Sequence, residues 1–362
     1  MTGILSGWPV QDFLRRTGAR VPIIQAPMAG AGGVDLAVAA IRGGALGSLP
    51  CAMLTPDQVG EQVAAVRSQA DGPLNLNFFC HTLGEPPDET RWRALLAPFY
   101  QTEGVGPPQT PPPLRAPFDE AMFSVVQALR PEAVSFHFGL PEPRLVERIR
   151  GAGIVVIGNA TTFAEGQWLA GQVDMIIAQG FEAGGHAGHF LEGYRPEGTL
   201  ALTRAVVLEA DVTLEPVIAA GGVGGAAGIA AAPALGAGAG QLGTAYLHTA
   251  EATISDAHRA ALGEETVVTN LFSGGLARGV RNKLIDKIGP VHPDSPRFPY
   301  ASAALAELRR VAEANGRGDY SPMWAGQAAA LGRPPRNQLP EGAQTLTERL
   351  AREAFELLGE TP

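Results

Sequence analysis

Eight short apolar segments alternate with stretches of helical length over residues 22–244, and this alternation restricts the fold more than any other feature of the chain. Apolar runs of this length are typical of strands that are buried on both faces. A strand followed each time by a helix predicts parallel pairing. We expect the strands at 22–25, 45–49, 74–79, 133–138, 154–158, 173–179, 216–220 and 239–244.

Amphipathic or Ala-rich segments separate most of these strands, and we expect helices at 56–68, 118–129, 142–152, 162–170 and 203–210. About eight strand–helix repeats over roughly 250 residues match a closed (β/α)8 barrel. The count alone does not exclude an open, doubly wound sheet. We therefore predict an α/β fold with a TIM barrel spanning residues 1–250.

Two segments interrupt the alternation. Residues 81–117 are rich in Pro and contain one short helix-like stretch, so we expect an excursion that covers part of the barrel mouth. A small, mostly helical substrate or lid domain is expected at 251–320, over the carboxyl-terminal face of the barrel, where barrels carry their chemistry. Residues 321–362 are expected to return to the barrel and to include a final helix at 345–358.

Charge and composition exclude several classes of function. The net charge is −9 and no run rich in Lys or Arg occurs, so we expect no nucleic-acid partner. The uncharged stretch 216–250 is mostly Gly and Ala, which gives a membrane span little transfer free energy. The N-terminus shows no export signal and the chain has two cysteines, which together predict a cytoplasmic protein without a disulfide scaffold. No set of metal ligands, reactive thiol or Walker loop is apparent.

The unusual residues follow the expected strands. Gly-rich, His-containing or amide-bearing stretches come directly after seven of them, starting with APMAGAGG at 26–33. The carboxyl ends of parallel barrel strands meet at one face, so these residues are expected to lie together. Random placement would put about half of them at the opposite face, which serves stability.

The two loops that follow the last two strands predict a phosphate site. They read AAGGVGG at 219–225 and GTAYL at 243–247, and each precedes a helical segment. Glycines allow backbone N–H groups to approach an anion, and barrels commonly bind phosphate at these loops. The alternative is that the glycines only form tight turns.

The loop QGFEAGGHAGHF at 179–190 is the most informative stretch. Gly184 and Gly185 would let the chain lie flat against a planar ligand, and the amide of Gln179 can bond to ring heteroatoms. His186 follows them and could take a proton or stabilise a negative charge. The alternative for His186 is a purely structural, hydrogen-bonded histidine, which is the role we expect for His189. Glu182 is either a solvated loop charge or a group that orients His186.

The order of PIIQAPMAG, NLNFF, SFHFGLP, AQGFEAGGHAGHF, PVIAAGGVGG, QLGTAYL, ARGVRNKL and MWAGQAA resembles the nitronate monooxygenase family, formerly 2-nitropropane dioxygenase. The likeness runs from about residue 20 to about residue 330, and the SFHFGLP and WAGQ signatures resemble its first class. It implies a TIM barrel that binds FMN, together with a smaller substrate domain.

The resemblance also implies roles for individual residues. His186 takes the place of the catalytic histidine, and His137 and Tyr300 resemble residues of the substrate pocket. Asn77, Gln179 and Gly184 would hold the isoalloxazine ring, and the ribityl phosphate end would be held by Gly221, Gly222, Gln241, Gly243 and Thr244. The remaining cofactor positions are Ala26, Pro27, Met28, Gly185, Trp324 and Gln327.

The implied reaction is the oxidation of an alkyl nitronate, such as propionate 3-nitronate, by O2 to a carbonyl compound and nitrite, without nicotinamide. His186 would stabilise the nitronate or remove the α-proton of a neutral nitroalkane. The family often reads SGRPARG where this chain reads SGGLARG, so Gly275 and Leu276 replace an Arg-Pro pair while Arg278 remains. The missing arginine could change the preference for substrates that carry a carboxylate.

Two other functions stay open on the sequence alone. Flavin barrels also include NAD(P)H-dependent quinone or enoyl-thioester reductases with similar Gly loops, and a flavin- or phosphate-binding sensor without turnover is conceivable. The resemblance is compatible with a homodimer.

Overall fold

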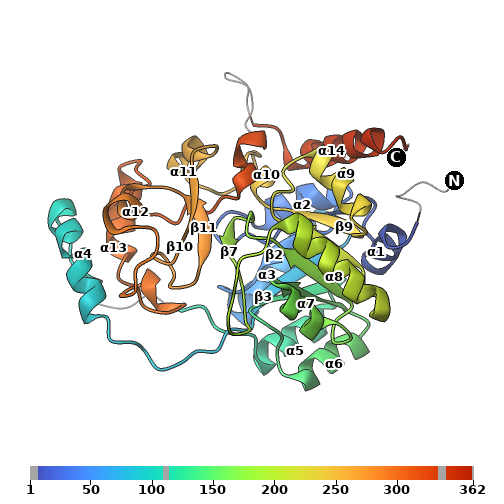
Figure 1. Ribbon diagram of the computed structural model, residues 1–362, viewed down its shortest axis with the longest axis horizontal. Coiled ribbons are helices and arrows are strands. Elements are labelled where there is room, and N and C mark those ends of the chain that lie inside the picture. Colours follow the sequence, from blue (N-terminus) through green and yellow to red (C-terminus); the bar gives the residue numbers. More distant parts are fainter. Residues whose placement is uncertain (1–6, 109–113, 333–339, 361–362) are drawn as a thin grey trace.

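The computed structural model describes residues 7–108, 114–332 and 340–360, and a sheet of eight parallel strands forms its centre (Figure 1). The sheet order is β1-β9-β8-β6-β5-β4-β3-β2, and an isolated parallel bridge between Ile24 and Leu46 joins its two edge strands into a barrel. The strands are β1 Ile23–Gln25, β2 Gly47–Pro50, β3 Leu74–Phe79, β4 Ala133–His137, β5 Val155–Ala160, β6 Met175–Gln179, β8 Val217–Ala220 and β9 Ala239–Leu242. The predicted barrel is confirmed.

Helices surround the barrel because each buries one apolar face against the strands. They are α2 Val34–Arg42, α3 Pro56–Arg67, α5 Glu120–Leu129, α6 Pro143–Gly151, α7 Phe163–Leu169, α8 Thr199–Thr213, α9 Ala226–Ala234 and α14 Ala343–Leu357. Local sequence sets where they begin. At α3, Thr55 and Gln58 form a capping box and Pro56 occupies the first turn, where its missing N–H costs nothing.

The amino-terminal end of the barrel is covered by α1 (Val10–Thr17), which the sequence analysis did not predict. Phe13 of this helix is fully buried among the residues of the barrel interior, including Ile24, Met175 and Ile218. A Cβ placed on Gly238, just before β9, would lie 3.0 Å from the carbonyl oxygen of Pro9. The helix therefore sits tightly under the strands, which leaves their carboxyl ends for the site.

A second body stands beside these carboxyl ends (Figure 1). It contains α11 Asp256–Ala261, β10 Thr266–Thr269, β11 Ala277–Val280, α12 Lys283–Ile288, the 3-10 turn η1 Tyr300–Ser302 and α13 Ala306–Ala314. The chain enters it through α10 (Thr244–Leu247) and leaves it through the 3-10 turn η2 (Gln327–Gly332). The body is mostly helical, as predicted.

The excursion at 81–117 supplies a helix to this second body. The helix is α4 (Thr90–Glu103), which lies beside α13, far from the barrel (Figure 1). Trp92 of α4 is fully buried in an apolar cluster with Leu271 and Tyr320, and the hydroxyl of Tyr100 donates to the carbonyl of Ala304 at 2.6 Å. Among its described residues, His81 at the start and Arg115 on the return reach the barrel mouth.

A three-stranded antiparallel sheet, which the sequence analysis did not predict, links the two bodies. Its order is β10-β11-β7, where β7 is the two-residue strand Gly185–His186 in the loop after β6. In this pairing His186 lies opposite Ala277. Within the described parts of the chain, no helix is long and apolar enough to cross a membrane.

Candidate active site

A cavity of about 710 Å³ opens at the carboxyl ends of the barrel strands. Most of the site residues expected from the sequence line it, namely Ala26, Pro27, Met28, Asn77, His137, Gln179, Gly184, Gly185, His186, Gly221, Gly222, Gln241, Gly243, Thr244 and Trp324. They come from six of the eight strand ends and from the segment that follows the second body. The fold therefore brings together residues spread over almost 300 positions of sequence, from Ala26 to Trp324.

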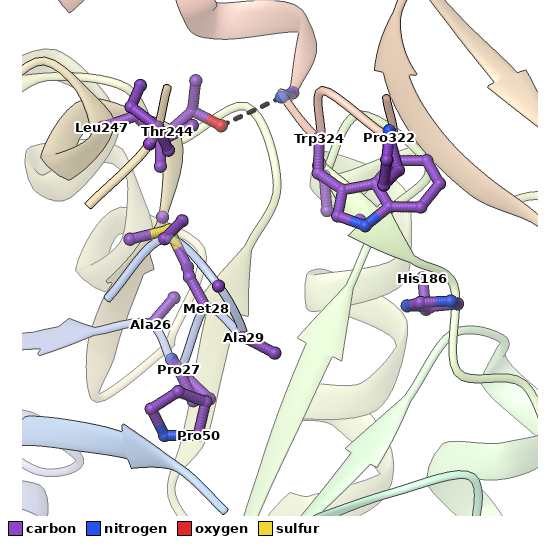
Figure 2. Close-up of a pocket in the computed structure, with 18 of the residues that line it drawn as sticks. Ala26, Pro27, Met28, Ala29, Pro50, His186, Thr244, Leu247, Pro322 and Trp324 are labelled. Atoms are coloured by element: carbon purple, nitrogen blue, oxygen red, sulfur yellow. Dashed lines mark hydrogen bonds between the residues drawn. The ribbon is translucent and has the colours of Figure 1, made fainter. Parts of the chain in front are cut away.

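Two walls face each other across this cavity (Figure 2). The loop after β1, with Ala26, Pro27 and Met28, lies on one side, and His186 and Trp324 lie on the other. These walls are largely apolar and leave a space between them for a flat ring system. Thr244 stands at one end of the space, where its hydroxyl accepts a hydrogen bond of 2.9 Å from the backbone N–H of Gly326.

The Gly-rich end of the cavity has the features of an anion site. Gly221 and Gly222 have φ values of +96° and +69°, a backbone conformation that favours glycine. A Cβ on Gly222 would meet nothing closer than Glu182 at 3.6 Å, so the space in front of this backbone is open. Among contacts between described residues, the N–H groups of Gly222 and Thr244 donate no hydrogen bond. Free backbone donors of this kind suit a phosphate.

A buried polar atom also points to a ligand. Gln241, at the end of β9, is 8% exposed, and its side-chain oxygen has no hydrogen-bond partner. A buried acceptor without a partner costs free energy unless a ligand or water donates to it. Gln241, the open glycine backbone and the flat apolar walls together fit the polar ribityl chain, the phosphate and the ring of a flavin nucleotide.

The backbone of His186 is held from two sides. The side-chain amide of Gln179 donates to the carbonyl of His186 at 2.8 Å, and β7 pairs with β11 of the second body. On the ring, Nε2 lies 2.8 Å from the hydroxyl of Ser273. Nδ1 has no hydrogen bond to any described residue, so it is the nitrogen left for a substrate.

The imidazole of His186 is neutral at physiological pH. The rings of Phe79, Phe138, Phe298 and Trp324 surround it, with centroids 5.2–6.1 Å away. Burial lowers the pKa of His186 to about 3, and the positive charge of Arg115 adds to the effect. A histidine held neutral in this way can accept a proton or donate one hydrogen bond, but it does not bring a positive charge to the site.

His137 is a second neutral imidazole of the cavity. The amide of Asn77 donates to its Nδ1 at 3.0 Å, so the ring proton resides on Nε2. Burial lowers the pKa of His137 to about 4, while a hydrogen bond with Gln179 acts in the opposite direction. The cysteines are not competing nucleophiles, because burial raises the pKa of Cys51 to about 12 and also raises that of Cys80.

Glu182 performs neither of the two roles that the sequence left open. Both of its carboxylate oxygens accept hydrogen bonds from Thr199, from the backbone N–H at 2.9–3.1 Å and from the hydroxyl at 2.8 Å. Glu182 therefore ties the loop after β6 to the start of α8. Arg278 supports the same loop, because its Nε donates to the carbonyl of Phe181 at 2.9 Å.

Two of the expected site residues do not line the cavity. The hydroxyl of Tyr300 donates to the carbonyl of Gly84, which directs the side chain into the contact with the excursion. The side chain of Gln327 is exposed, and its backbone N–H donates to the carbonyl of Glu182 at 2.9 Å. His189 also lies outside the cavity and stacks on Tyr194 at 4.3 Å, which agrees with its expected structural role.

Other residues of the site were missed by the sequence analysis. Arg115 and Phe79 line the cavity, and Ser273 and Phe298 contact His186. Phe79 ends the NLNFF strand and could have been found from the strand-end argument. Arg115 stands in a Pro-rich stretch, and Ser273 and Phe298 come from a distant body, so no local pattern marks them.

Because of its buried histidines, the protein is expected to lose stability against unfolding as the pH falls. Burial lowers the pKa of His258 and of His137 to about 4 and that of His186 to about 3, whereas an unfolded histidine titrates near about 6.5. Between these values the unfolded chain binds more protons, so this stability is present above pH 6.5 and is lost as the pH falls. Each group contributes a slope of up to about 1.4 kcal/mol per pH unit.

Urea unfolding between pH 7.5 and pH 5 measures this slope, and His258→Gln is the matched variant because the Nε2–H of His258 donates to the carbonyl of Trp324. We expect the variant to lose stability less steeply with falling pH than the unchanged protein. Equal slopes of the unfolding free energy against pH in the two proteins would contradict the lowered pKa of His258.

Comparison with known proteins agrees with the geometry. The sequence model of the family described as nitronate monooxygenase matches residues 13–339. A nitronate monooxygenase of Paraburkholderia phytofirmans is 41% identical over 87% of this chain and 89% of its own, and one of Pseudomonas aeruginosa is 38% identical over 93% and 98%.

Solved structures give the same result. Nitroalkane oxidase from Streptomyces ansochromogenes has a TM-score of 0.82 at 32% identity, covering 93% of this chain and 96% of its own. FabK from Thermotoga maritima has a TM-score of 0.73 at 23% identity, covering 96% and 97%, and shares the fold. The protein is therefore an oxidoreductase, and this chain belongs to the nitronate monooxygenase family, which is a family of flavin-dependent enzymes.

Proposed function

We propose that this protein uses FMN and O2 to oxidise alkyl nitronates, such as propionate 3-nitronate, to a carbonyl compound and nitrite. The observation that carries the proposal is the position of His186. Its imidazole faces the loop after β1 across a cavity with room for a flat ring, and its Nδ1 has no hydrogen bond to a described residue.

The residues of the cavity suit FMN. Gly222 and Thr244 would hold the phosphate, Gln241 the ribityl chain, and Asn77 and Gln179 the ring edge. When it is bound there, FMN supplies electron transfer between the substrate and oxygen. The phosphate end needs no cationic side chain, because the backbone N–H groups supply the donors.

The protonation state of His186 favours a nitronate over a neutral nitroalkane. A base with a pKa of about 3 has little driving force to remove a proton from carbon, whereas a nitronate has already lost that proton. The neutral ring would hold the nitronate by a hydrogen bond from Nδ1–H. The aromatic residues around it, including Phe79 and Phe298, exclude water and strengthen this bond.

We expect the purified protein to be yellow and to release nitrite and consume O2 when propionate 3-nitronate is added. We also expect kcat/KM for the nitronate to exceed that for 3-nitropropionate by about 100-fold or more, because His186 is a weak base. Steady-state oxygen consumption with both forms measures the ratio. The control is anaerobic mixing with NADPH, which should leave the flavin oxidised. Rapid bleaching by NADPH without nitronate turnover would support a reductase, and a yellow protein that turns over neither would support a sensor.

A further inference from the structure

Arg115 is a cationic side chain of the cavity without an anionic partner. It lies on the stretch that returns from the excursion to α5, and its guanidinium makes no hydrogen bond or ion pair with any described residue. Its Nε atom is buried. A buried, unpaired charge is costly, so a site of this kind favours an anion from outside the protein.

The other charged side chains of the cavity have hydrogen-bond or ion-pair partners within the protein. Glu182 is bound to Thr199, and Glu313 accepts from Arg309 at 3.4 Å and from the hydroxyl of Ser321 at 2.6 Å. Arg309 and Glu313 thus offset each other. His81 and His186 face Arg115 as well, and burial lowers the pKa of both, so neither brings a charge at neutral pH. Among the described charged residues of the cavity, Arg115 is therefore the one whose side chain has neither a hydrogen bond nor an ion pair.

Arg115 and His186 lie on the same apolar surface. The guanidinium carbon of Arg115 is 5.8 Å from the ring centroid of Phe298, and the ring of His186 is 5.2 Å from it. A Cβ on Gly275 would lie 3.3 Å from Phe298 and 3.5 Å from His186, so a side chain at position 275 would also point here. Position 275 is glycine, and the guanidinium near Phe298 and His186 comes instead from Arg115.

We infer that Arg115 binds the carboxylate tail of the substrate, so that a nitronate with a negatively charged tail is held between Arg115 and His186. This inference rests on the proposed function, and it names the residue that selects among nitronates. Arginine suits the task because its planar guanidinium can form two parallel hydrogen bonds to one carboxylate.

Kinetics of Arg115→Met with two substrates test the inference. We expect KM for propionate 3-nitronate to rise about 10- to 100-fold, as for the loss of a charged hydrogen-bond pair. KM for propyl 1-nitronate, which has the same head and no carboxylate, should change less than about threefold, and kcat for both should change little. Arg115→Lys keeps the charge but not the planar fork, so its KM for propionate 3-nitronate should lie between those of the unchanged protein and Arg115→Met.

The matched control is Arg93→Met, which removes a positive charge from the same excursion outside the cavity, where Arg93 pairs with Glu89 at 2.8 Å. It should not change the ratio of the two KM values. Equal loss with both nitronates in Arg115→Met would overturn the inference, because Arg115 would then hold the nitronate head or the fold. Unchanged KM values would overturn it as well.

A binding measurement separates this inference from the proposed function. Propionate, which cannot react, should change the flavin absorbance of the holoenzyme more than propionamide does. Arg115→Met should abolish this difference between the two compounds. That result would support carboxylate binding by Arg115 even if no nitronate were oxidised. No difference between propionate and propionamide in the unchanged holoenzyme would overturn it, whatever the turnover.

Discussion

The His186→Asn variant is expected to lose about 100- to 1000-fold in kcat/KM for propionate 3-nitronate while its flavin stays bound. A fixed hydrogen-bonding group in a water-excluded site is commonly worth this much to a reaction. The Asn amide can place a donor near the position of Nδ1, but the side chain is too short to reach Ser273, so the contact that fixes the orientation of the ring is lost. The backbone contacts of residue 186, from Gln179 and from β11, do not depend on the side chain, so the loop should keep its shape.

His189→Asn is the matched control, since His189 lies in the same loop but stacks on Tyr194 outside the cavity. Its kcat/KM should stay within about threefold of the unchanged protein. The measurements are steady-state oxygen consumption, flavin absorbance and circular dichroism on both variants. Full turnover by His186→Asn, with normal flavin content, would remove the imidazole from the mechanism.

Gly222→Asp is expected to weaken FMN binding by about 100-fold relative to Gly222→Asn. Both substituents have the same shape, and Asp and Asn both tolerate the left-handed backbone of Gly222 (φ +69°). A Cβ there would have 3.6 Å to its nearest neighbour, so both chains should fold. The variants differ only in a negative charge beside the proposed phosphate. Two unit charges at roughly 5 Å repel by about 3 kcal/mol at an effective dielectric constant of 20.

Titration of FMN into the deflavinated variants, followed by flavin fluorescence, gives the two dissociation constants. Circular dichroism checks that both variants are folded, because Asp at position 222 also lies near Glu182. Equal affinities for FMN would show that the phosphate is bound elsewhere in the cavity. A loss in Gly222→Asn as large as that in Gly222→Asp would mean that bulk, and not charge, is excluded at this position.

The barrel could be predicted from the sequence because its signals are local. Buried parallel strands such as β3 (Leu74–Phe79) are continuous apolar runs, and the predicted bounds of this strand agree with the structure. The carboxyl ends of such strands must meet at one face, which is why Asn77, Gln179 and Gly222 could be placed in one site before any coordinates were known. The topology of the barrel, not the individual residues, made this step possible.

Features that depend on contacts between distant segments could not be predicted in this way. The strands β7 and β11 are only two and four residues long, and neither has a pattern that distinguishes it from a loop. β7 forms by pairing with β11, and β11 also pairs with β10. Arg115 lies beside Phe298 of the second body, and the lowered pKa of His186 depends on burial among rings from several different segments. Tyr300 and Gln327 were expected in the site from the resemblance to the family, but their hydrogen bonds direct them away from the cavity.

The pairing of β7 with β11 also restricts how this enzyme can admit its substrate. His186 lies on β7, which is paired with β11 of the second body. A rotation of that body away from the barrel would therefore break this pairing or displace the imidazole. We therefore expect substrate to enter and leave through movements of side chains at the rim while β7 and β11 stay paired. In such a protein the site keeps its geometry throughout turnover, and substrate access depends on rim side chains and not on a hinge between the two bodies.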